Sequence, residues 1–475
     1  MSTSSAGERT GQQHLAHVVF IAGAAAVGGF LFGYDSSNIN GAVLGIQRHF
    51  DVGEAITGLT VSSALIGSAV GAWFGGVLSR RAGRIRTMKL AAILFFVSAI
   101  GAMFPFSVWD LAIWRVVGGV AIGVASVIGP AYIAEVAPPA YRGRLASLQQ
   151  LAIVLGIGSS ALVNWFIKDS SPIGADGTHD INGMLGGVEA WQWMLGAAAV
   201  PAVIYFVLAS IIPESPHYLV SMGRFDQARA VLAQVEGDGA DADAKLADIR
   251  RELSTERRPA IRDILGGKLG LLPIVWIGIA LAAFQQFVGI NVIFYYSDTL
   301  WHSVGQNTDS LLISMVSPTI NIIGTLIAIA FIDRIGRKPL LLIGSVGMAI
   351  GLGVAAIAFG NAVTVDGALR LPGVWGPVAL VFANVFVLSF ALSWGVILWV
   401  LLGEMFPLRI REAALAVGTA ANWVANWIVT VSFPSMGAWN LSVTYWIYAA
   451  FAVLSIPFVL KFIKETKGTA IEDVR

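Results

Sequence analysis

The sequence predicts an all-α membrane protein whose twelve transmembrane helices form two pseudo-symmetric six-helix bundles with a short cytoplasmic helical insert. Three observations predict this fold. Charged residues make up only 12% of the 475 residues, about half the share of a soluble domain. Twelve segments are long and apolar enough to cross a bilayer. Short charged motifs recur at matching places in the two halves of the chain.

The composition also excludes several other classes of protein. Hydrophobic residues make up 56% of the chain, whereas disordered chains have few hydrophobic residues and a high net charge. The net charge is +1, so we expect no nucleic-acid partner. With no cysteine and six scattered histidines, we expect no disulfide, no metal site and no cofactor. No motif for catalysis stands out, so we do not expect an enzyme.

The predicted spans divide the chain into two halves. They are 15–46, 56–78, 88–106, 109–136, 145–167, 191–212, 271–300, 311–332, 339–360, 375–402, 413–433 and 441–463. We therefore expect an N-terminal bundle over 15–212, a helical cytoplasmic linker over 213–270, a C-terminal bundle over 271–463 and a tail over 464–475. The linker carries 19 charged residues, and we interpret it as solvated short helices, with a regulator-binding segment as the alternative.

Lysine and arginine indicate the orientation. Of the 30 basic residues, 26 lie on the side of both termini, whereas only Arg48, Lys168 and Arg370 lie on the other side. Because basic loops stay in the cytoplasm, we expect both termini there, in a multi-pass protein of the cell membrane. The remaining basic residue, Arg115, lies inside a span.

An internal repeat marks the cytoplasmic ends of the spans. Arg-Ala-Gly-Arg at 81–84 corresponds to Arg-Ile-Gly-Arg at 334–337. A glutamate after the fourth and tenth spans is followed by proline at +3 and arginine at +7. Ion pairs between such residues would close the cytoplasmic side, so the spacing predicts a cytoplasmic gate. Its residues are Arg84, Glu135, Arg142, Arg337, Glu404 and Arg411. The alternative is that basic residues only set topology, which we favour for Arg80, Arg86 and Lys338.

Charged residues inside the membrane are scarce. Asp35 lies in the first span and Arg115 in the fourth, both in the outer half of the bilayer, so the two side chains can meet. Because an intramembrane charge costs several kcal/mol, such residues are functional candidates. The alternatives are a static ion pair or an aspartate that faces the outer vestibule.

Amide side chains gather in the spans as well. Amides offer both a donor and an acceptor, and they are costly to bury without a partner, so they predict a site for a polar, uncharged ligand. The alternative is hydrogen bonding between helices. These residues are Gln149, Gln150, Gln285, Gln286, Asn291, Asn321, Asn422 and Asn426.

Several segments in order resemble the sugar porters of the major facilitator superfamily. They read GGFLFGYD at 28–35, PESP at 213–216, QQ at 285–286 with Asn291, DRIGR at 333–337 and ETKG at 465–468. The resemblance covers about residues 17–468 and is strongest to bacterial proton-linked sugar permeases of the glucose and xylose type. The chain departs from the pattern at Arg80, at His217 and in the tenth span, which lacks a proline, so we expect Gly395 to supply the bend there.

The resemblance implies roles for individual residues. It implies that Asp35 carries the proton and that Arg115 is its partner. It also implies a sugar site, to which we add Phe32 because it lies one turn before Asp35. The residues of this site are Phe32, Gln150, Gln285, Gln286, Asn291, Asn321, Trp399 and Asn422. Trp423, Tyr295 and Tyr296 are further candidates for the wall and the outer gate.

We therefore expect a monomeric proton-coupled symporter that imports a monosaccharide by alternating access. Ile157 favours a hexose, D-glucose first, because related xylose carriers have glutamine there. The alternatives are a facilitative uniporter, or a symporter for xylose, another monosaccharide or a polyol such as inositol. A sugar sensor is disfavoured by the short tail after the last span.

Overall fold

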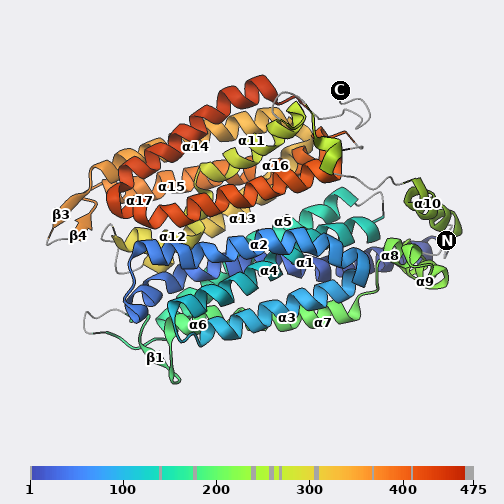
Figure 1. Cartoon of the computed structure of the whole chain (residues 1–475), viewed down its shortest axis with the longest axis horizontal. Helices are drawn as coiled ribbons and strands as arrows, with labels where there is room; N and C mark the ends of the chain where they lie inside the picture. Colours follow the sequence, from blue (N-terminus) through green and yellow to red (C-terminus); the bar gives the residue numbers. More distant parts are fainter. Residues whose placement is uncertain are drawn as a thin grey trace.

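The computed structural model describes residues 3–138, 142–174, 179–236, 242–255, 261–266, 270–303, 310–365, 368–407 and 410–465. Long helices run roughly parallel to one axis and form two bundles that lie side by side (Figure 1). Two small hairpins lie at one end of the molecule, and both termini lie at the other. We call these the hairpin end and the terminal end.

Among the described residues the first bundle contains seven helices, the last two of which form one span over Ala190–Ile211. They are α1 (Thr3–Phe50), α2 (Glu54–Ala82), α3 (Arg84–Met103), α4 (Val108–Val136), α5 (Arg142–Asp169), α6 (Ala190–Gly196) and α7 (Ala199–Ile211). A hairpin of β1 (Met184–Leu185) and β2 (Val188–Glu189) precedes α6. At the terminal end, the linker forms α8 (Pro216–Ser221), α9 (Phe225–Glu236), α10 (Ala242–Thr255) and a 3₁₀ turn over Ile261–Ile264.

The second bundle repeats the plan of the first. Its helices are α11 (Pro273–Phe287), α12 (Ile290–Ser303), α13 (Ser310–Ile335), α14 (Arg337–Gly360), α15 (Trp375–Ala391), α16 (Trp394–Met405) and α17 (Arg411–Phe462). A hairpin of β3 (Val363–Val365) and β4 (Ala368–Arg370) lies between α14 and α15.

The number of spans follows from one long helix. Within the described residues, 11 helical segments are long and apolar enough to cross a membrane, and the last of them covers 50 residues. At about 1.5 Å per residue it would measure about 75 Å, more than twice a hydrocarbon core. Its backbone leaves the helical region at Asn440, with φ −161° and ψ 102°. This segment is therefore two membrane helices, and the twelve-helix fold predicted from the sequence is confirmed.

Two spans of the second bundle are broken. The span formed by α11 and α12 breaks at Gly289, whose φ of +82° favours glycine. The span formed by α15 and α16 breaks at Ser393, with φ −137° and ψ −92°, and not at Gly395 as expected. The Ser393 hydroxyl donates to the Ser389 carbonyl at 2.6 Å. The hydroxyl thus replaces the backbone N–H that would donate to this carbonyl in a regular helix.

Small residues let the helices approach closely. A Cβ atom on Gly67 or Gly71 of α2 would lie about 2 Å from a carbonyl oxygen of α4, namely that of Val116 or Val120. In return, Gly119 of α4 would meet the Ala64 carbonyl oxygen at 1.9 Å. Such contacts are typical of membrane bundles, where association depends on close packing of small residues.

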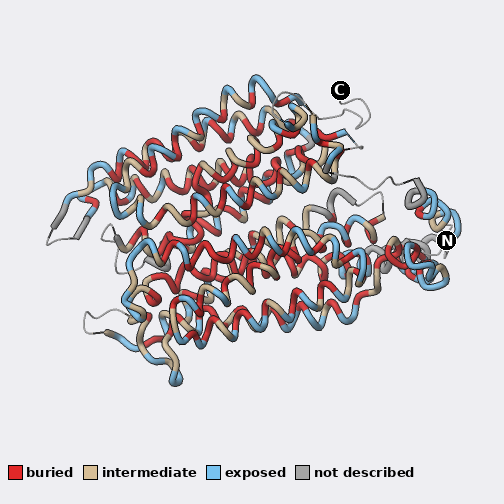
Figure 2. Tube along the Cα trace, in the orientation of Figure 1, coloured by how far each residue is buried: buried red, intermediate tan, exposed pale blue. Residues whose placement is uncertain are grey.

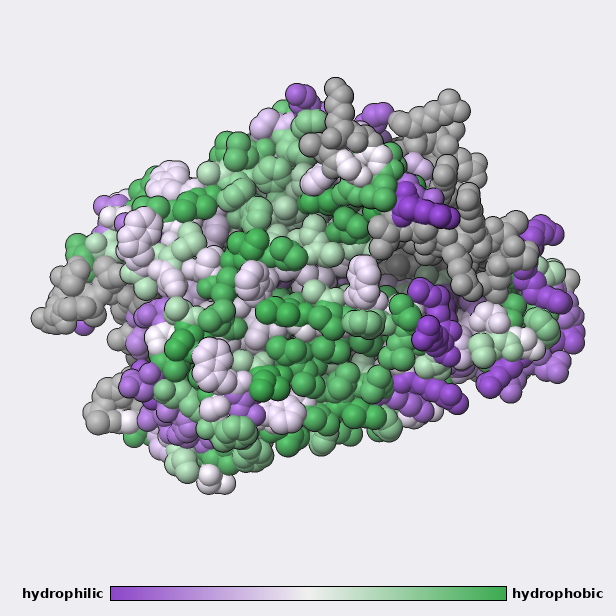
Figure 3. All heavy atoms as spheres, in the orientation of Figure 1, coloured by the Kyte–Doolittle hydropathy of each residue, from purple (hydrophilic) through white to green (hydrophobic). Residues whose placement is uncertain are grey.

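The outer surface is apolar and the interior is mixed. Buried positions follow the centre of each bundle in Figure 2. In the same view, hydrophobic side chains cover the faces of the long helices, and hydrophilic ones gather toward the two ends (Figure 3). The exposed apolar side chains include Trp73, Phe74, Phe106, Val374 and Trp439, all at least 58% exposed. A surface of this kind suits contact with lipid.

Candidate functional site

The predicted intramembrane charges, Asp35 and Arg115, are in contact. The Arg115 Nη1 atom of α4 donates to the Asp35 carboxylate Oδ2 and to the Asp35 carbonyl, both at 3.2 Å. Their side chains are 5% and 9% exposed. The contact is through one guanidinium nitrogen only, and the buried Arg115 Nε has no hydrogen-bond partner among the described residues. Separating a buried pair leaves an uncompensated charge, so each of the two charges depends on the presence of the other.

An amide cluster lies inside the second bundle. It joins Gln285 and Gln286 at the end of α11 to Asn291 on α12 and Asn422 on α17. Gln286 Nε2 donates to Asn422 Oδ1 and to Gln285 Oε1, both at 3.1 Å. Asn291 Nδ2 donates to Gln286 Oε1 at 2.7 Å, and Asn422 Nδ2 donates to Gln285 Oε1 at 2.7 Å. These four predicted sugar residues are therefore one hydrogen-bonded unit.

The helix break after α11 positions this cluster. Residues 285 and 286 lie in its last turn, and Gly289 turns the chain so that Asn291 reaches back to Gln286. Backbone carbonyls hold the cluster on its other sides, because Gln285 Nε2 donates to the Trp394 carbonyl and Asn422 Nδ2 to the Ala282 carbonyl, both at 3.1 Å.

An aromatic contact connects the two bundles near this cluster. The rings of Phe32 on α1 and Trp423 on α17 lie 5.7 Å apart, at an angle of 43°. Phe32 is three residues before Asp35, and Trp423 follows Asn422 directly. Phe32 and Trp423 thus connect α1, which carries Asp35, with α17, which carries Asn422.

Three predicted sugar residues lie outside this unit. Gln150 on α5 is partly exposed, Asn321 on α13 is buried, and Trp399 on α16 is 41% exposed. Their side chains have no hydrogen-bond partner among the described residues. The helices α5 and α13 nevertheless meet across the bundle boundary, because a Cβ atom on Gly158 would lie 2.9 Å from the Ile322 side chain.

A polar seam joins α1 to α12 on the hairpin side of Asp35. Ser37 Oγ donates to the Phe294 carbonyl at 3.3 Å, and Asn40 Nδ2 donates to Ser297 Oγ at 3.2 Å. The Asp298 amide N–H donates to Asn40 Oδ1 at 3.0 Å. All these side chains are buried. Sequence reasoning missed Ser37 and Asn40, although an asparagine within an apolar span was an available signal.

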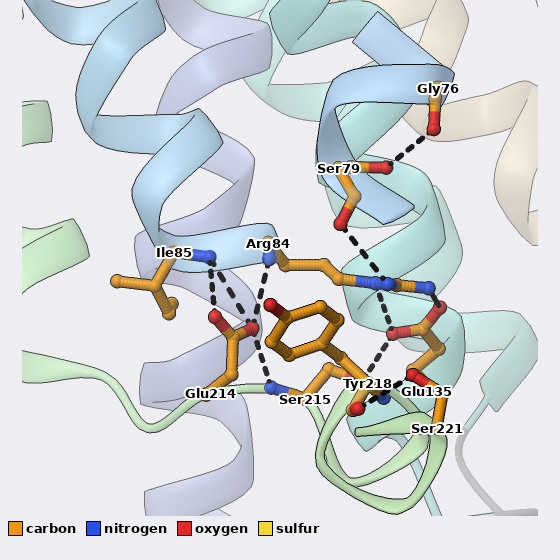
Figure 4. A network of polar contacts seen from close by, with 9 residues as sticks. All are labelled: Gly76, Ser79, Arg84, Ile85, Glu135, Glu214, Ser215, Tyr218 and Ser221. Atoms are coloured by element: carbon orange, nitrogen blue, oxygen red, sulfur yellow. Dashed lines mark hydrogen bonds and ion pairs between the residues drawn. The ribbon is translucent and has the colours of Figure 1, made fainter. Parts of the chain in front are cut away.

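The first half of the predicted gate is an ion-pair network inside the first bundle (Figure 4). Arg84 donates to both Glu135 oxygens, from Nε at 2.9 Å and from Nη2 at 2.6 Å. Ser215 Oγ also donates to Glu135. Glu214 Oε1 accepts from the Arg84 backbone N–H at 3.0 Å, so it caps the start of α3, where Gly83 has a φ of +95°.

The second half repeats this geometry inside the second bundle. Arg337 donates to Glu404 from Nε at 3.2 Å and from Nη2 at 2.8 Å. Glu465 accepts the backbone N–H groups of Arg337 and Lys338 at 3.0 Å, after Gly336 with φ +103°. The repeat inferred from the sequence thus extends to Glu214 and Glu465.

The position of these pairs corrects one expectation. We expected the ion pairs to run across the face and close it, but each pair lies within one bundle, because the paired helices are neighbours there. Arg411 Nε contacts the Phe406 carbonyl at 3.3 Å instead of a carboxylate. The side chain of Arg142 lies outside the described residues. A role of these residues in closing the terminal end stays a prediction.

Comparisons with known proteins agree with this geometry. A family model described as sugar (and other) transporter matches residues 21–475. The chain is 51% identical to a glucose transport protein of Synechocystis sp. over 96% of this chain and 97% of that protein. It is 35% identical to the D-xylose-proton symporter of Escherichia coli K12, over 98% and 96% of the two chains.

Solved structures give the same result for the fold. A partially occluded inward-open conformation of the xylose transporter XylE from Escherichia coli matches with a TM-score of 0.81. That match is 34% identical and covers 96% of this chain and 100% of the other. Together with the twelve spans and the repeated motifs, these findings show that the chain is a multi-pass member of the sugar porter family of the major facilitator superfamily.

Proposed function

We propose that the protein is a proton-coupled monosaccharide symporter that imports a hexose, with D-glucose as the first candidate. The observation that carries this proposal is the buried Asp35–Arg115 pair, on whose helix α1 Phe32 contacts Trp423 of α17, the helix that also carries Asn422 of the amide cluster. The name of the 51% identical relative, a glucose transport protein, supports the sugar. The name of the D-xylose-proton symporter supports the coupling.

In this mechanism Asp35 binds the proton. Protonation removes the carboxylate charge that Arg115 faces, so the pair weakens and α1 is free to move relative to α4. Phe32 lies on the same helix and would carry that movement to Trp423 beside the sugar site. The gradient supplies about 2.3 kcal/mol per 100 mV for each charge, besides its pH component.

The amides would bind the sugar hydroxyls. Gln286, Asn291 and Asn422 each combine a donor and an acceptor, and their mutual hydrogen bonds preorganise them. Gln150 and Asn321 would contribute from α5 and α13, and the rings of Trp399 and Trp423 would cover the apolar faces of the sugar.

The two bundles would rock about the site as rigid bodies. We propose the first over 15–212 and the second over 271–463, joined by the linker at 213–270, with the terminal end in the cytoplasm of the cell. The α1–α12 seam would then close the outer side, a state that agrees with the match to an inward-open structure.

Uptake into proteoliposomes tests the proposal. With an imposed inward proton gradient, labelled D-glucose should accumulate above its outside concentration, and a protonophore should abolish that accumulation but not exchange. If the protonophore leaves glucose accumulation unchanged, proton symport is excluded. If glucose only reaches the same concentration on both sides, the protein is a uniporter.

The choice of sugar needs a separate measurement. Several relatives carry xylose or arabinose in their names, so a pentose is the second candidate. Unlabelled glucose, galactose, xylose, arabinose and inositol should compete with labelled glucose to different extents. Glucose should compete most strongly, and failure of every hexose to compete would overturn the substrate proposed here.

A further inference from the structure

The turn between α2 and α3 carries positive charge that its counterpart lacks. Aligning Gly83 with Gly336 pairs Arg80 with position 333, Arg86 with 339 and Lys89 with 342. In the second bundle these positions hold aspartate, proline and leucine. The first bundle therefore presents three cations at positions where the second has none, while the second has one, Lys338, opposite Ile85.

These cations have no acidic partner in the described part of the chain. Arg80 and Arg86 are exposed and Lys89 is partly exposed, and none of the three forms an ion pair there. The neighbouring carboxylates are already occupied, because Glu135 binds Arg84 and Ser215, and Glu214 caps α3. The charge of the three side chains is thus available to an external anion.

Arg80 and Arg86 each lie at the end of an exposed apolar stripe. On α2, Arg80 follows Trp73 and Val77 at helical spacing, and both apolar side chains are exposed, by 58% and 37%. On α3, Arg86 precedes a stripe whose members are 39–46% exposed. They are Leu90, Ile93, Val97 and Ile100.

Side-chain direction strengthens this placement. The Arg80 Nη1 atom lies 3.8 Å from where a Cβ atom on Gly76 would be, so the guanidinium folds back along α2 toward its apolar face. Helical side chains lean toward the N-terminus of their helix, and here this brings the guanidinium beside the apolar surface of α2. Figure 3 shows the apolar surface of this face bordered by hydrophilic residues at the terminal end.

We propose that Arg80, Arg86 and Lys89, here named the α2–α3 corner, bind the headgroup of an anionic phospholipid in the leaflet at the terminal end. Its phosphate would lie among the three cations, and its acyl chains would lie along the exposed stripes of α2 and α3. A soluble phosphate would satisfy the charges but would gain nothing from the stripes. This inference goes beyond sugar transport and holds whichever sugar is carried.

Lipid titration of the purified protein tests the α2–α3 corner. Phosphatidylglycerol is added to the detergent-solubilised protein, and the midpoint of thermal unfolding is followed by tryptophan fluorescence, since the chain has 15 tryptophans. The wild type should be stabilised by phosphatidylglycerol and much less by phosphatidylcholine. A triple variant with Arg80→Gln, Arg86→Gln and Lys89→Gln should need at least about tenfold more phosphatidylglycerol for the same shift.

A matched variant separates a site from general attraction. Arg334→Gln, Lys461→Gln and Lys464→Gln remove the same charge from the second bundle and should leave the titration unchanged. Equal losses in both triple variants, or no loss in the first, would overturn the proposal. If glycerol phosphate reproduces the shift, the corner is an anion site and not a lipid site. Should the triple variant unfold, Lys89→Leu, which copies the residue of the second bundle, must still weaken the lipid response.

Discussion

Asp35 is the residue on which coupling depends in the proposed mechanism. Asp35→Asn keeps the size and hydrogen-bonding ability of the side chain but removes the ionisable group that faces Arg115. We expect sugar exchange to persist while proton-driven accumulation falls to the equilibrium level, measured in the same proteoliposomes. Asp110→Asn is a suitable control, because Asp110 is also a buried aspartate of this bundle but accepts from the Phe106 N–H. Full accumulation by Asp35→Asn would contradict the role.

Gln286 is the centre of the amide cluster. Gln286→Ala removes the donor to Asn422 and the acceptor for Asn291, so the amides that remain lose their orientation. With net values near 1 kcal/mol per hydrogen bond, glucose should bind about tenfold more weakly. Calorimetric titration measures the change. Asn384→Ala removes a buried amide that pairs with Ser317 elsewhere in the bundle, and it should leave affinity unchanged.

Glu189 offers a pH test outside the membrane-spanning segments. Burial raises the pKa of its carboxyl group, but hydrogen bonds from Asn182, His49 and Trp191 outweigh this and hold the pKa below its usual value. Because the folded pKa is the lower one, the stabilisation is present above about pH 4.5 and is lost as the pH falls through the folded pKa.

The expected result is a pH-dependent difference in unfolding temperature. Glu189→Gln should unfold at a lower temperature than the wild type at pH 7, and the difference should shrink in acid. Glu54→Gln, a change at an exposed acid of α2, should show no such trend. A difference that stays constant with pH would mean that the charge of Glu189 contributes nothing.

The sequence predicted some contacts of single residues and missed others. Asp35 and Arg115 were paired correctly because charges inside spans are so few that each has few candidate partners. Ser37 and Asn40 were missed, because small polar residues are common in spans and the sequence does not show which face of α1 meets α12.

At the scale of elements, the proposed mechanism requires the α1–α12 seam to break when the outer side opens. Asn40→Ala removes two of its hydrogen bonds, worth about 2 kcal/mol together, and should raise the outward-open population by a factor of order ten or more. Because the chain has no cysteine, Ile39→Cys, at a buried position of α1, reports opening through its rate of labelling by an impermeant maleimide.

A control within the same helix bundle checks that result. Asn164 donates to the Asn38 carbonyl at 2.9 Å, and this bond joins α5 to α1 without crossing to the second bundle. Labelling of Ile39→Cys should therefore accelerate with Asn40→Ala and not with Asn164→Ala. Equal acceleration by both changes would show general loosening of α1 and would contradict a specific seam.

Element boundaries were harder to predict than element number. The interruption of the seventh span at Gly289 and of the tenth at Ser393 depends on local hydrogen bonds and on φ values, which apolarity does not record. The ion pairs could be predicted from the spacing of the motifs. Their location within one bundle could not, because it depends on which helices are neighbours in the fold.

For the whole molecule, the orientation is the main expectation to check. The linker helices α8–α10 lie at the terminal end together with both termini. The linker and the two termini should therefore be on the cytoplasmic side. A protease added to right-side-out membrane vesicles should spare the linker, whereas inside-out vesicles should allow cleavage between α9 and α10. The hairpins should show the opposite protection, and cleavage of the linker in right-side-out vesicles would reverse the orientation.

The location of the ion-pair networks has a thermodynamic consequence. Since each network ties together helices of a single bundle, the networks do not hold the two bundles together, whereas the hydrogen bonds of the seam do so on the hairpin side. The three hydrogen bonds of the seam amount to roughly 3 kcal/mol, which corresponds to a preference near a hundredfold. The proton or the sugar can invert a bias of that size only if its affinities for the two states differ by more than the same factor, so tight binding alone would not switch the protein.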